Sequence, residues 1–431
     1  MVAERSNDNR PTFLVWDNEG RPPEGKWIPV LWRGFGNDGD APAYSIPRRV
    51  EEQAESLRAR YLAWVHDLGD ARIHGVRLVD CLSLRPGFSY WWMTLPAAVP
   101  FGGSTPIYSA MRMLALEGLA GELSPGKIIL ASGDKFLARA ARLWCRTAGL
   151  EFEWRRLETV SEQASLAKRI YRSLPYPIQA AASLLRYLRQ RWPLRQREIP
   201  SGAVSGGKVT FVDYLIHLNL KDLATGRYGS HYWTDLIDAL QADAVKLNWL
   251  HHYVGHEAVP TTQQARDLIA RFNQNGAGIQ FHTTPDGALG WSVIKCVVRD
   301  YSRIVRAGLR LRKARDYFRP ADSEVDLWPL LERDWRNSMF GPAAVSNCLF
   351  INLLERTLKR LPHQELGVYL LENQPWERAF VHAWKAAGHG RLVGVPHSTV
   401  LYWDLRYFFD PRSYRRTGKN DLPLPDQVAL N

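Results

Sequence analysis

Polar side chains suited to acid–base or phosphate chemistry follow two neighbouring apolar segments near the end of the chain. Glu372 comes directly after the apolar run 366–371, and His397 follows the next run, 391–395. Because the carboxyl ends of parallel strands meet at one edge of a sheet, we expect both side chains to face the same crevice. An imidazole there can bind a phosphate and offset the charge of a leaving group.

The residues beside these two positions extend the candidate site. Gln374 and Glu377 lie at the start of the helix expected after residue 375, and Ser398 and Thr399 add two hydroxyl groups next to the histidine. Helix N-termini present free N–H groups that attract anions, so this region is expected to bind a nucleotide phosphate. Glu377 has an alternative role, because an acid in the first turn also stabilises the positive end of its own helix.

A transfer reaction needs a base for the incoming hydroxyl group, and the sequence offers three positions for it. Asp213 ends the expected strand 209–212 and is the first choice, while His217 and His231 are the alternatives. A capping or surface role is an equally good interpretation of each of the three.

The elements that must position these residues form two α/β regions. The segment 127–154 is a strand–helix–strand unit, and the same alternation restarts at residue 209 after a small-residue linker at 201–207. We therefore predict two Rossmann-like domains with extra basic helices. The expected divisions are 1–160 for an N-terminal α/β region, 161–206 for a basic helical segment with its linker, 207–340 for a second α/β region, and 341–431 for the start of a C-terminal Rossmann domain.

The net charge of +12 is concentrated in two segments. One is the long helix expected over 291–317. The other is 168–197, which has no acidic residue and whose amphipathic pattern predicts membrane-facing side chains at Lys168, Arg169, Arg172, Arg186, Arg189 and Trp192. A basic amphipathic helix with aromatic residues suits an anionic membrane surface, and a domain-linking helix with a solvated basic face is the alternative. With neither a secretory signal nor a spanning segment, we expect a cytoplasmic protein that contacts the inner membrane peripherally.

Several classes of chemistry find no support in the sequence. The four cysteines are far apart and read as buried reduced thiols, and neither a phosphate-binding loop of the G-x-x-x-x-G-K type nor a nucleophile elbow is present. His251, His252 and His256 lack a nearby carboxylate with zinc-site geometry. No paired-aspartate metal motif stands out, so we expect neither a metal nor another cofactor. Nucleic-acid binding is disfavoured because no recognition motif accompanies the charge.

The stretch YLLENQPWERAFVHAWKAAGHGRLVGVPHSTVLYWDLRYF, residues 369–408, resembles the signature region of bacterial surface-carbohydrate biosynthesis proteins, a family of sugar transferases encoded with O-antigen genes. The pieces 89–92 (SYWW) and 229–233 (GSHYW) resemble the same family. That family is itself similar to capsule, Kdo-type and sialic-acid-type transferases of the two-Rossmann, GT-B class.

The resemblance implies a glycosyltransferase that moves a sugar from a nucleotide-activated donor, with a CMP-sugar favoured, to a surface polysaccharide or O-antigen acceptor that can be lipid-linked. It places the donor phosphate at His397 and an acidic residue at Glu372, and it assigns Tyr232 and Trp233 to the acceptor side of the cleft. A GT-B donor domain starting near residue 345 would need more chain than remains before Asn431, so a truncated C-terminal domain is expected. The alternative function is a non-catalytic, membrane-associated scaffold of a polysaccharide assembly complex.

Overall fold

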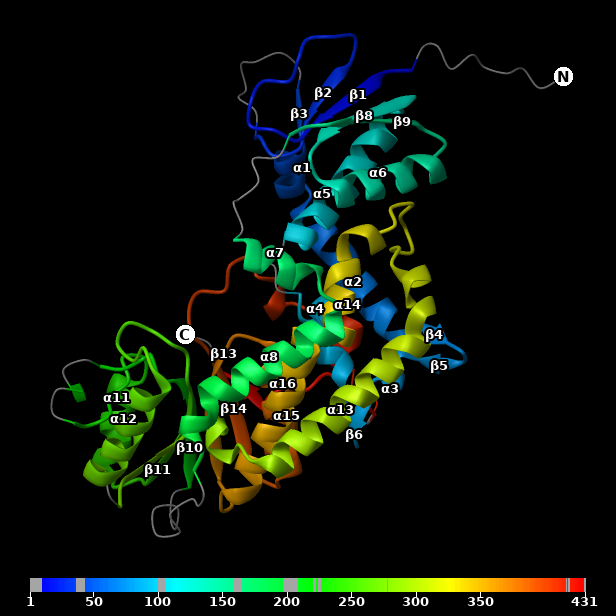
Figure 1. Cartoon of the computed structure of the whole chain (residues 1–431). Coiled ribbons are helices and arrows are strands. Elements are labelled where there is room, and N and C mark those ends of the chain that lie inside the picture. Colours follow the sequence, from blue (N-terminus) through cyan, green and yellow to red (C-terminus); the bar gives the residue numbers. More distant parts are fainter. Residues whose placement is uncertain are drawn as a thin grey trace.

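The computed structural model describes residues 10–35, 43–99, 105–158, 165–196, 208–219, 222–223, 226–276, 278–415, 417 and 419–429. The chain is a mixed α/β protein with two parallel sheets, which lie at opposite ends of the molecule with a layer of helices between them (Figure 1). The predicted α/β class is confirmed.

The first sheet is built by the N-terminal part of the chain and has five parallel strands in the order β3-β2-β1-β8-β9. Its strands are β1 (Thr12–Trp16), β2 (Ile28–Leu31), β3 (Tyr44–Ser45), β8 (Lys127–Ser132) and β9 (Glu151–Arg156). The helices of this region are α1 (Ile46–Glu52), α2 (Ala54–Asp70), α5 (Thr105–Leu123) and α6 (Lys135–Thr147). The β8–α6–β9 unit matches the sequence prediction for 127–154, and the side chain of Asp134 caps α6 by accepting the N–H groups of Phe136 and Leu137.

The second sheet has six parallel strands in the order β12-β11-β10-β13-β14-β15. They are β10 (Val209–Tyr214), β11 (Leu247–His252), β12 (Gln280–Thr283), β13 (Leu366–Leu371), β14 (Arg391–Pro396) and β15 (Gln427–Val428). In order of appearance this is 3-2-1-4-5-6, the Rossmann arrangement. The strand order reverses between β10 and β13, and the crevice at that point is where open α/β sheets bind ligands. Helices α11 (Thr234–Ala242), α12 (Thr262–Asn275) and α16 (Pro375–Ala386) belong to this sheet.

This sheet corrects the predicted boundary between residues 340 and 341. Strand β13 pairs directly with β10, so the strands expected in two separate domains form one sheet. Strands β13, β14 and β15 extend the sheet that begins at Val209, so the separate domain expected to begin near residue 345 is not formed.

The long connection from β12 to β13 is helical and covers the second sheet. It contains α13 (Trp291–Arg310), the 3-10 segment η6 (Leu311–Tyr317), α14 (Trp328–Phe340) and α15 (Pro342–Arg360). Within the basic segment expected at 161–206, the described residues form α7 (Leu166–Ser173) and α8 (Tyr176–Arg191), which are separated at Pro175 as predicted. The linker predicted at 201–207 lies outside the described residues. Helix α8 packs against α15 through the buried side chain of Ala180.

An N-terminal segment crosses into this helical layer. It comprises β4 (Arg72–Ile73), β5 (Val76–Arg77), α3 (Leu78–Cys81), β6 (Ser83–Arg85), β7 (Phe88–Ser89), the 3-10 turn η2 (Tyr90–Met93) and α4 (Leu95–Ala98). Four residues of the apolar stretch 77–82 form α3. Arg85 binds Asp300 of α13 and Glu355 of α15, each at 2.7 Å, and the Tyr90 hydroxyl donates to the carbonyl of Ser338 at 2.6 Å. The region 1–160 is thus not packed as an independent unit.

Among the described residues, no helix combines the length and the apolar character needed to cross a bilayer.

Candidate functional site

The structure brings Glu372 and His397 together at the carboxyl edge of the second sheet. Leu371 and Pro396 are register partners on β13 and β14, so the residues that follow them leave the sheet side by side. The Nδ1 atom of His397 lies 3.6 Å from a carboxylate oxygen of Glu372. That nitrogen is shielded from solvent and has no hydrogen-bond partner in the described part of the chain, while Nε2 lies 3.4 Å from the hydroxyl of Ser398. The two groups form a half-buried acid–imidazole pair.

Arg406 adds a positive charge to this pair and was not identified from the sequence. It lies in the 3-10 turn η7 (Leu405–Tyr407), where its guanidinium binds Asp404 at 2.6 Å and approaches Glu372 at 3.8 Å. The Tyr407 hydroxyl donates to the carbonyl of Leu371 at 2.7 Å and fixes this turn against the end of β13. The only signal for Arg406 in the sequence is its place inside the stretch 369–408.

Glu377 does not face the crevice, contrary to the predicted role in donor binding. Its side chain is buried, and its carboxylate accepts the backbone N–H groups of Glu372, Asn373 and Gln374 at 2.9–3.2 Å. Burial raises the pKa of Glu377 to about 8. The N–H groups and the charge of Arg378 act in the opposite direction, because they favour the carboxylate. The N–H groups expected to hold a ligand phosphate are therefore occupied by the protein's own side chain.

The loop that Glu377 holds has a constrained backbone. Asn373 adopts a left-handed conformation with φ of 56°, and its side-chain oxygen accepts a 2.7 Å hydrogen bond from Arg378. The amide of Gln374 donates to Glu372 at 3.2 Å, so Gln374 orients the acid of the pair. Gln374 thereby helps to hold the Glu372 carboxylate at the tip of β13.

Asp213 is buried at the end of β10, and its carboxylate has no exposed surface. It accepts hydrogen bonds from the His217 ring, from the hydroxyl of Ser230 at 3.1 Å and from the backbone N–H of Tyr214 at 2.6 Å. A carboxylate so enclosed cannot touch an acceptor, which corrects the first choice for the base. The accessible partner is His217, one of the two alternatives.

Tyr232 connects the two histidine-containing pairs. Its ring centroid lies 4.4 Å from that of His217, 4.5 Å from that of His231 and 6.4 Å from that of His397. Tyr232 is partly exposed, as an acceptor contact requires. Trp233 is buried in the core against Phe211, so its predicted place on the cleft wall is wrong.

The remaining predicted positions are distributed as follows. Ser398 and Thr399 are exposed beside His397. On α7 and α8, Lys168, Arg169, Arg172, Arg186 and Arg189 are exposed, in agreement with a surface role. Trp192 is half-buried, and its ring packs 6.0 Å from that of Trp291.

The other histidines of this sheet are structural. His251 and His282 lie edge to edge in the core with 3.0 Å between Nε2 and Nδ1, and burial lowers the pKa of His251 and of His252 to about 3. Within the described ranges, no group of three or more His, Cys, Asp or Glu side chains is placed to hold a metal ion.

A second polar cluster occupies the corresponding edge of the N-terminal sheet. The Asp17 carboxylate, at the end of β1, accepts hydrogen bonds from Ser132 at the end of β8 (2.6 Å) and from Arg33 (2.5 Å). Strands β1 and β8 are the pair at which the order of that sheet reverses. Sequence reasoning missed these three residues because each stands alone in its segment.

Comparison with known proteins adds no assignment: no protein-family model, no curated protein and no solved structure matches this chain.

Proposed function

We propose that this protein is a glycosyltransferase that uses a nucleotide-activated sugar, with the donor bound at the carboxyl ends of β13 and β14. The observation that supports this best is the Glu372–His397 pair, 3.6 Å apart beside the reversal point of a parallel sheet with Rossmann strand order. The resemblance of residues 369–408 to surface-carbohydrate biosynthesis proteins points to the same reaction class and favours a CMP-sugar. A surface glycan, lipid-linked or free, is the acceptor that this resemblance suggests.

The donor phosphate is proposed to lie against β14 rather than at the start of α16. Glu377 occupies the N–H groups at the α16 terminus, whereas His397, Ser398, Thr399 and Arg406 offer hydrogen-bond donors at the end of β14. These groups stabilise the negative charge that develops on the phosphate oxygen as its bond to the anomeric carbon breaks. Glu372 orients the imidazole by facing Nδ1, which leaves Nε2 for the phosphate.

We assign the role of base to His217. The acceptor hydroxyl oxygen forms the new bond to the anomeric carbon, and its proton passes to the imidazole of His217. Asp213 is then a positioning residue that holds His217 in one orientation and stabilises the imidazolium, as the acid does in an acid–histidine–nucleophile triad. Tyr232, between His217 and His397, is proposed to contact the sugar or the acceptor.

The function is tested by measuring the thermal stability of the full chain with CMP, UMP, UDP, GDP and their sugar conjugates. A transferase of this type gains stability with at least one nucleotide, because a ligand that binds only the folded state shifts unfolding. Absence of a shift with every member of this panel would contradict donor binding and favour the scaffold alternative.

A further inference from the structure

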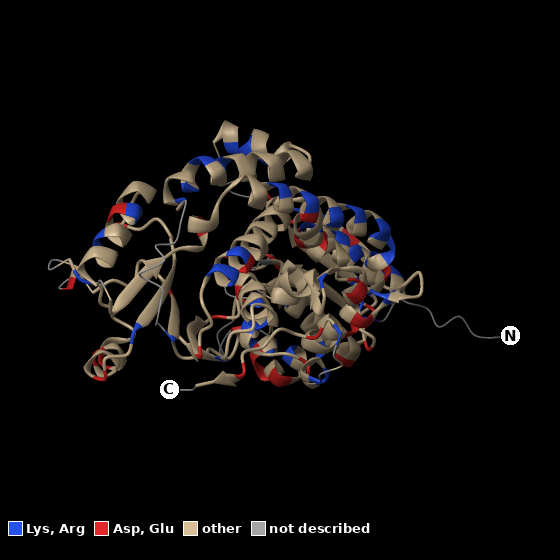
Figure 2. Cartoon of the chain, turned by 90° about the horizontal axis from the view of Figure 1, so that it is seen from below, with Lys and Arg blue, Asp and Glu red and all other residues tan. Residues whose placement is uncertain are grey.

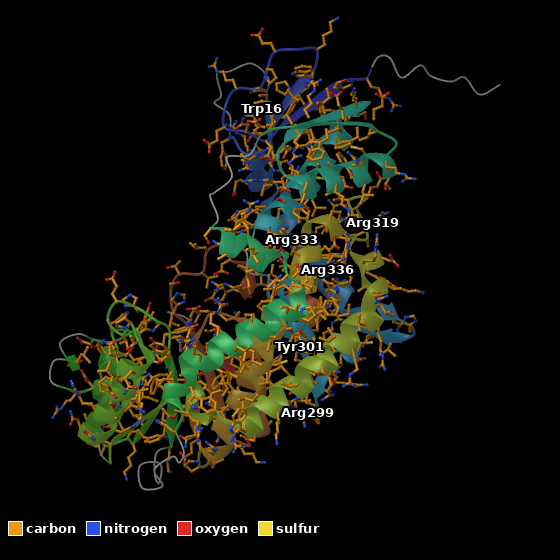
Figure 3. The ribbon with its side chains drawn as sticks, in the orientation of Figure 1. Trp16, Arg299, Tyr301, Arg319, Arg333 and Arg336 are labelled. Atoms are coloured by element: carbon orange, nitrogen blue, oxygen red, sulfur yellow. The ribbon has the colours of Figure 1, made fainter. Side chains whose placement is uncertain are left out.

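A large cavity lies away from the candidate active site, between the start of α8, the end of α13 with η6, and α14. It has a volume of about 650 Å³. Four arginines line it, one from α6, two from η6 and one from α14: Arg139, Arg312, Arg315 and Arg336. Figure 3 shows the labelled Arg336 on α14 close to the start of α8. Nothing in the proposed transfer reaction uses this cavity.

The positive charge in the cavity is only partly balanced. Glu332 is the one acid of its lining, and it binds Arg336 at 2.6 Å and Arg139 at 3.2 Å. Arg315 lies 4.0 Å from Asp316 and is also attracted to Asp326, and within the described part of the chain Arg312 has no acidic partner. Four guanidinium groups against one carboxylate favour an anion, and the planar guanidinium matches phosphate oxygens in particular.

The walls of the same cavity are apolar. The indoles of Trp328 and Trp335, which are nearly buried, and the ring of Tyr176 lie behind the arginines. Leu309, at the opening, leaves 48% of its surface exposed. An inorganic phosphate would use the arginines alone, whereas an amphiphile with a phosphate group would also cover these apolar surfaces.

The surroundings of the opening suit a bilayer surface. Helix α7 has no buried residue and exposes Leu166 and Ile170, and the first turn of α8 exposes Ile178 directly beside the cavity. Lysines and arginines follow one another along α8 and α13, which lie at one edge of the molecule (Figure 2). Exposed apolar side chains among basic ones are typical of surfaces that lie on anionic membranes.

We infer that this arginine-lined cavity binds the phosphate headgroup of a lipid in an anionic membrane against which α7, α8 and α13 lie. The inference deepens the expectation of membrane contact, and it does not depend on the sugar-transfer reaction. Glu332 fixes Arg139 and Arg336 in place, while Arg312 and Arg315 bind the phosphate oxygens. The rings of Tyr176, Trp328 and Trp335 contact the glycerol or prenyl carbons that follow the headgroup.

The test is flotation of the full chain with vesicles of phosphatidylcholine, alone or mixed with phosphatidic acid. The variant Arg312→Glu/Arg315→Glu changes the cavity. Its matched control, Arg299→Glu/Arg306→Glu, makes the same charge change on exposed positions of α13 outside the lining. We expect the mixed vesicles to bind the wild type at least about 10-fold better than pure phosphatidylcholine. Both variants should lose affinity as the diffuse attraction falls, and the cavity variant should lose at least about 10-fold more than the control, because only the cavity variant also loses the phosphate contacts.

Equal losses in the two variants would overturn the inference, because diffuse surface charge would then explain the binding. Inorganic phosphate is then added at the same concentration as the phosphatidic acid headgroups. If it releases the protein from the vesicles, the ligand of the cavity is free phosphate and not a lipid. Thermal unfolding of both variants verifies the fold, and the single variant Arg312→Gln repeats the test if the double variant unfolds. Nucleotide binding is measured on the same samples, so that a failure of the transferase proposal is distinguished from a failure of this one.

Discussion

The imidazole of His397 and the carboxylate of Glu372 lie 3.6 Å apart because their strands, β13 and β14, are paired to their last residues. The pair is held from both sides: Gln374 binds Glu372, and Arg406 approaches the same carboxylate at 3.8 Å. The other imidazole nitrogen, Nε2, contacts only the hydroxyl of Ser398 among the described residues and can bind a ligand.

His397→Asn is expected to lower kcat/KM for sugar transfer by about 100-fold or more, because the variant loses the imidazole nitrogen beside the leaving phosphate. The measurement is release of nucleotide from the sugar donor. His256→Asn is the matched control, since His256 is exposed beyond β11, and it should retain wild-type turnover. Equal turnover in the two variants would remove His397 from the site.

Asp213→Asn is expected to lower kcat by about 100- to 10,000-fold with a small change in KM, because the acid that orients His217 is lost. The pH profile of kcat should also move, which loss of packing alone would not cause. Ser230→Ala removes the 3.1 Å bond to the same carboxylate and the 3.3 Å bond from the Tyr232 N–H, but it leaves the Asp213–His217 contact and should cost far less. A pH profile identical to that of the wild type would argue against His217 as the base.

Glu377→Ala is expected to destabilise the fold by about 2–3 kcal/mol, because three backbone N–H groups lose a buried acceptor. Glu377→Gln retains one acceptor oxygen and should lose about half as much. Urea unfolding measures both values. An Ala variant as stable as the wild type would show that these N–H groups find other partners, and the α16 terminus would again become a candidate phosphate site.

Acid is expected to destabilise the fold through its buried histidines. Burial lowers the pKa of His251 and of His252 to about 3 from 6.5, so the unfolded chain takes up protons first as the pH falls. The contribution of these two neutral histidines to the free energy of unfolding is therefore full above pH 6.5 and is lost as the pH falls toward 3. At pH 5.5 each histidine should cost about 1.4 kcal/mol.

Urea midpoints at pH 7.5 and 5.5 measure this loss. His252→Phe keeps an aromatic ring against Trp376 and removes one titrating group, so the difference between the two pH values should shrink by about 1.4 kcal/mol. His256→Phe, at an exposed position, should leave the difference unchanged. Equal pH dependence in all three proteins would contradict a neutral, buried His252.

The local elements of the fold could be predicted from sequence, and their long-range pairing could not. Apolar runs such as 209–212 and 366–371 identify strands, and the rule that parallel strands end at one edge was sufficient to bring Glu372 and His397 together. The connection between β12 and β13 contains three long helices, and nothing in its pattern indicates that the chain returns to the same sheet. The sequence-based boundary at residue 340 failed for that reason.

The roles of single polar residues were the harder part of the site. Asp213 and Glu377 both stand at strand or helix ends, where the sequence permits either a ligand contact or an internal one. Burial decides between the two: both carboxylates are enclosed and satisfied by the protein itself. Arg406 and Asp17 had no informative neighbours, so only the folded structure brings them to the sheet edges.

The most direct test of the proposed donor site is a crystal structure of the protein soaked with CMP. Our account predicts density for the phosphate at the end of β14, within hydrogen-bonding distance of Nε2 of His397 and near Arg406. A nucleotide bound elsewhere, or a soaked crystal in which this position holds only solvent although the nucleotide binds in solution, would contradict it.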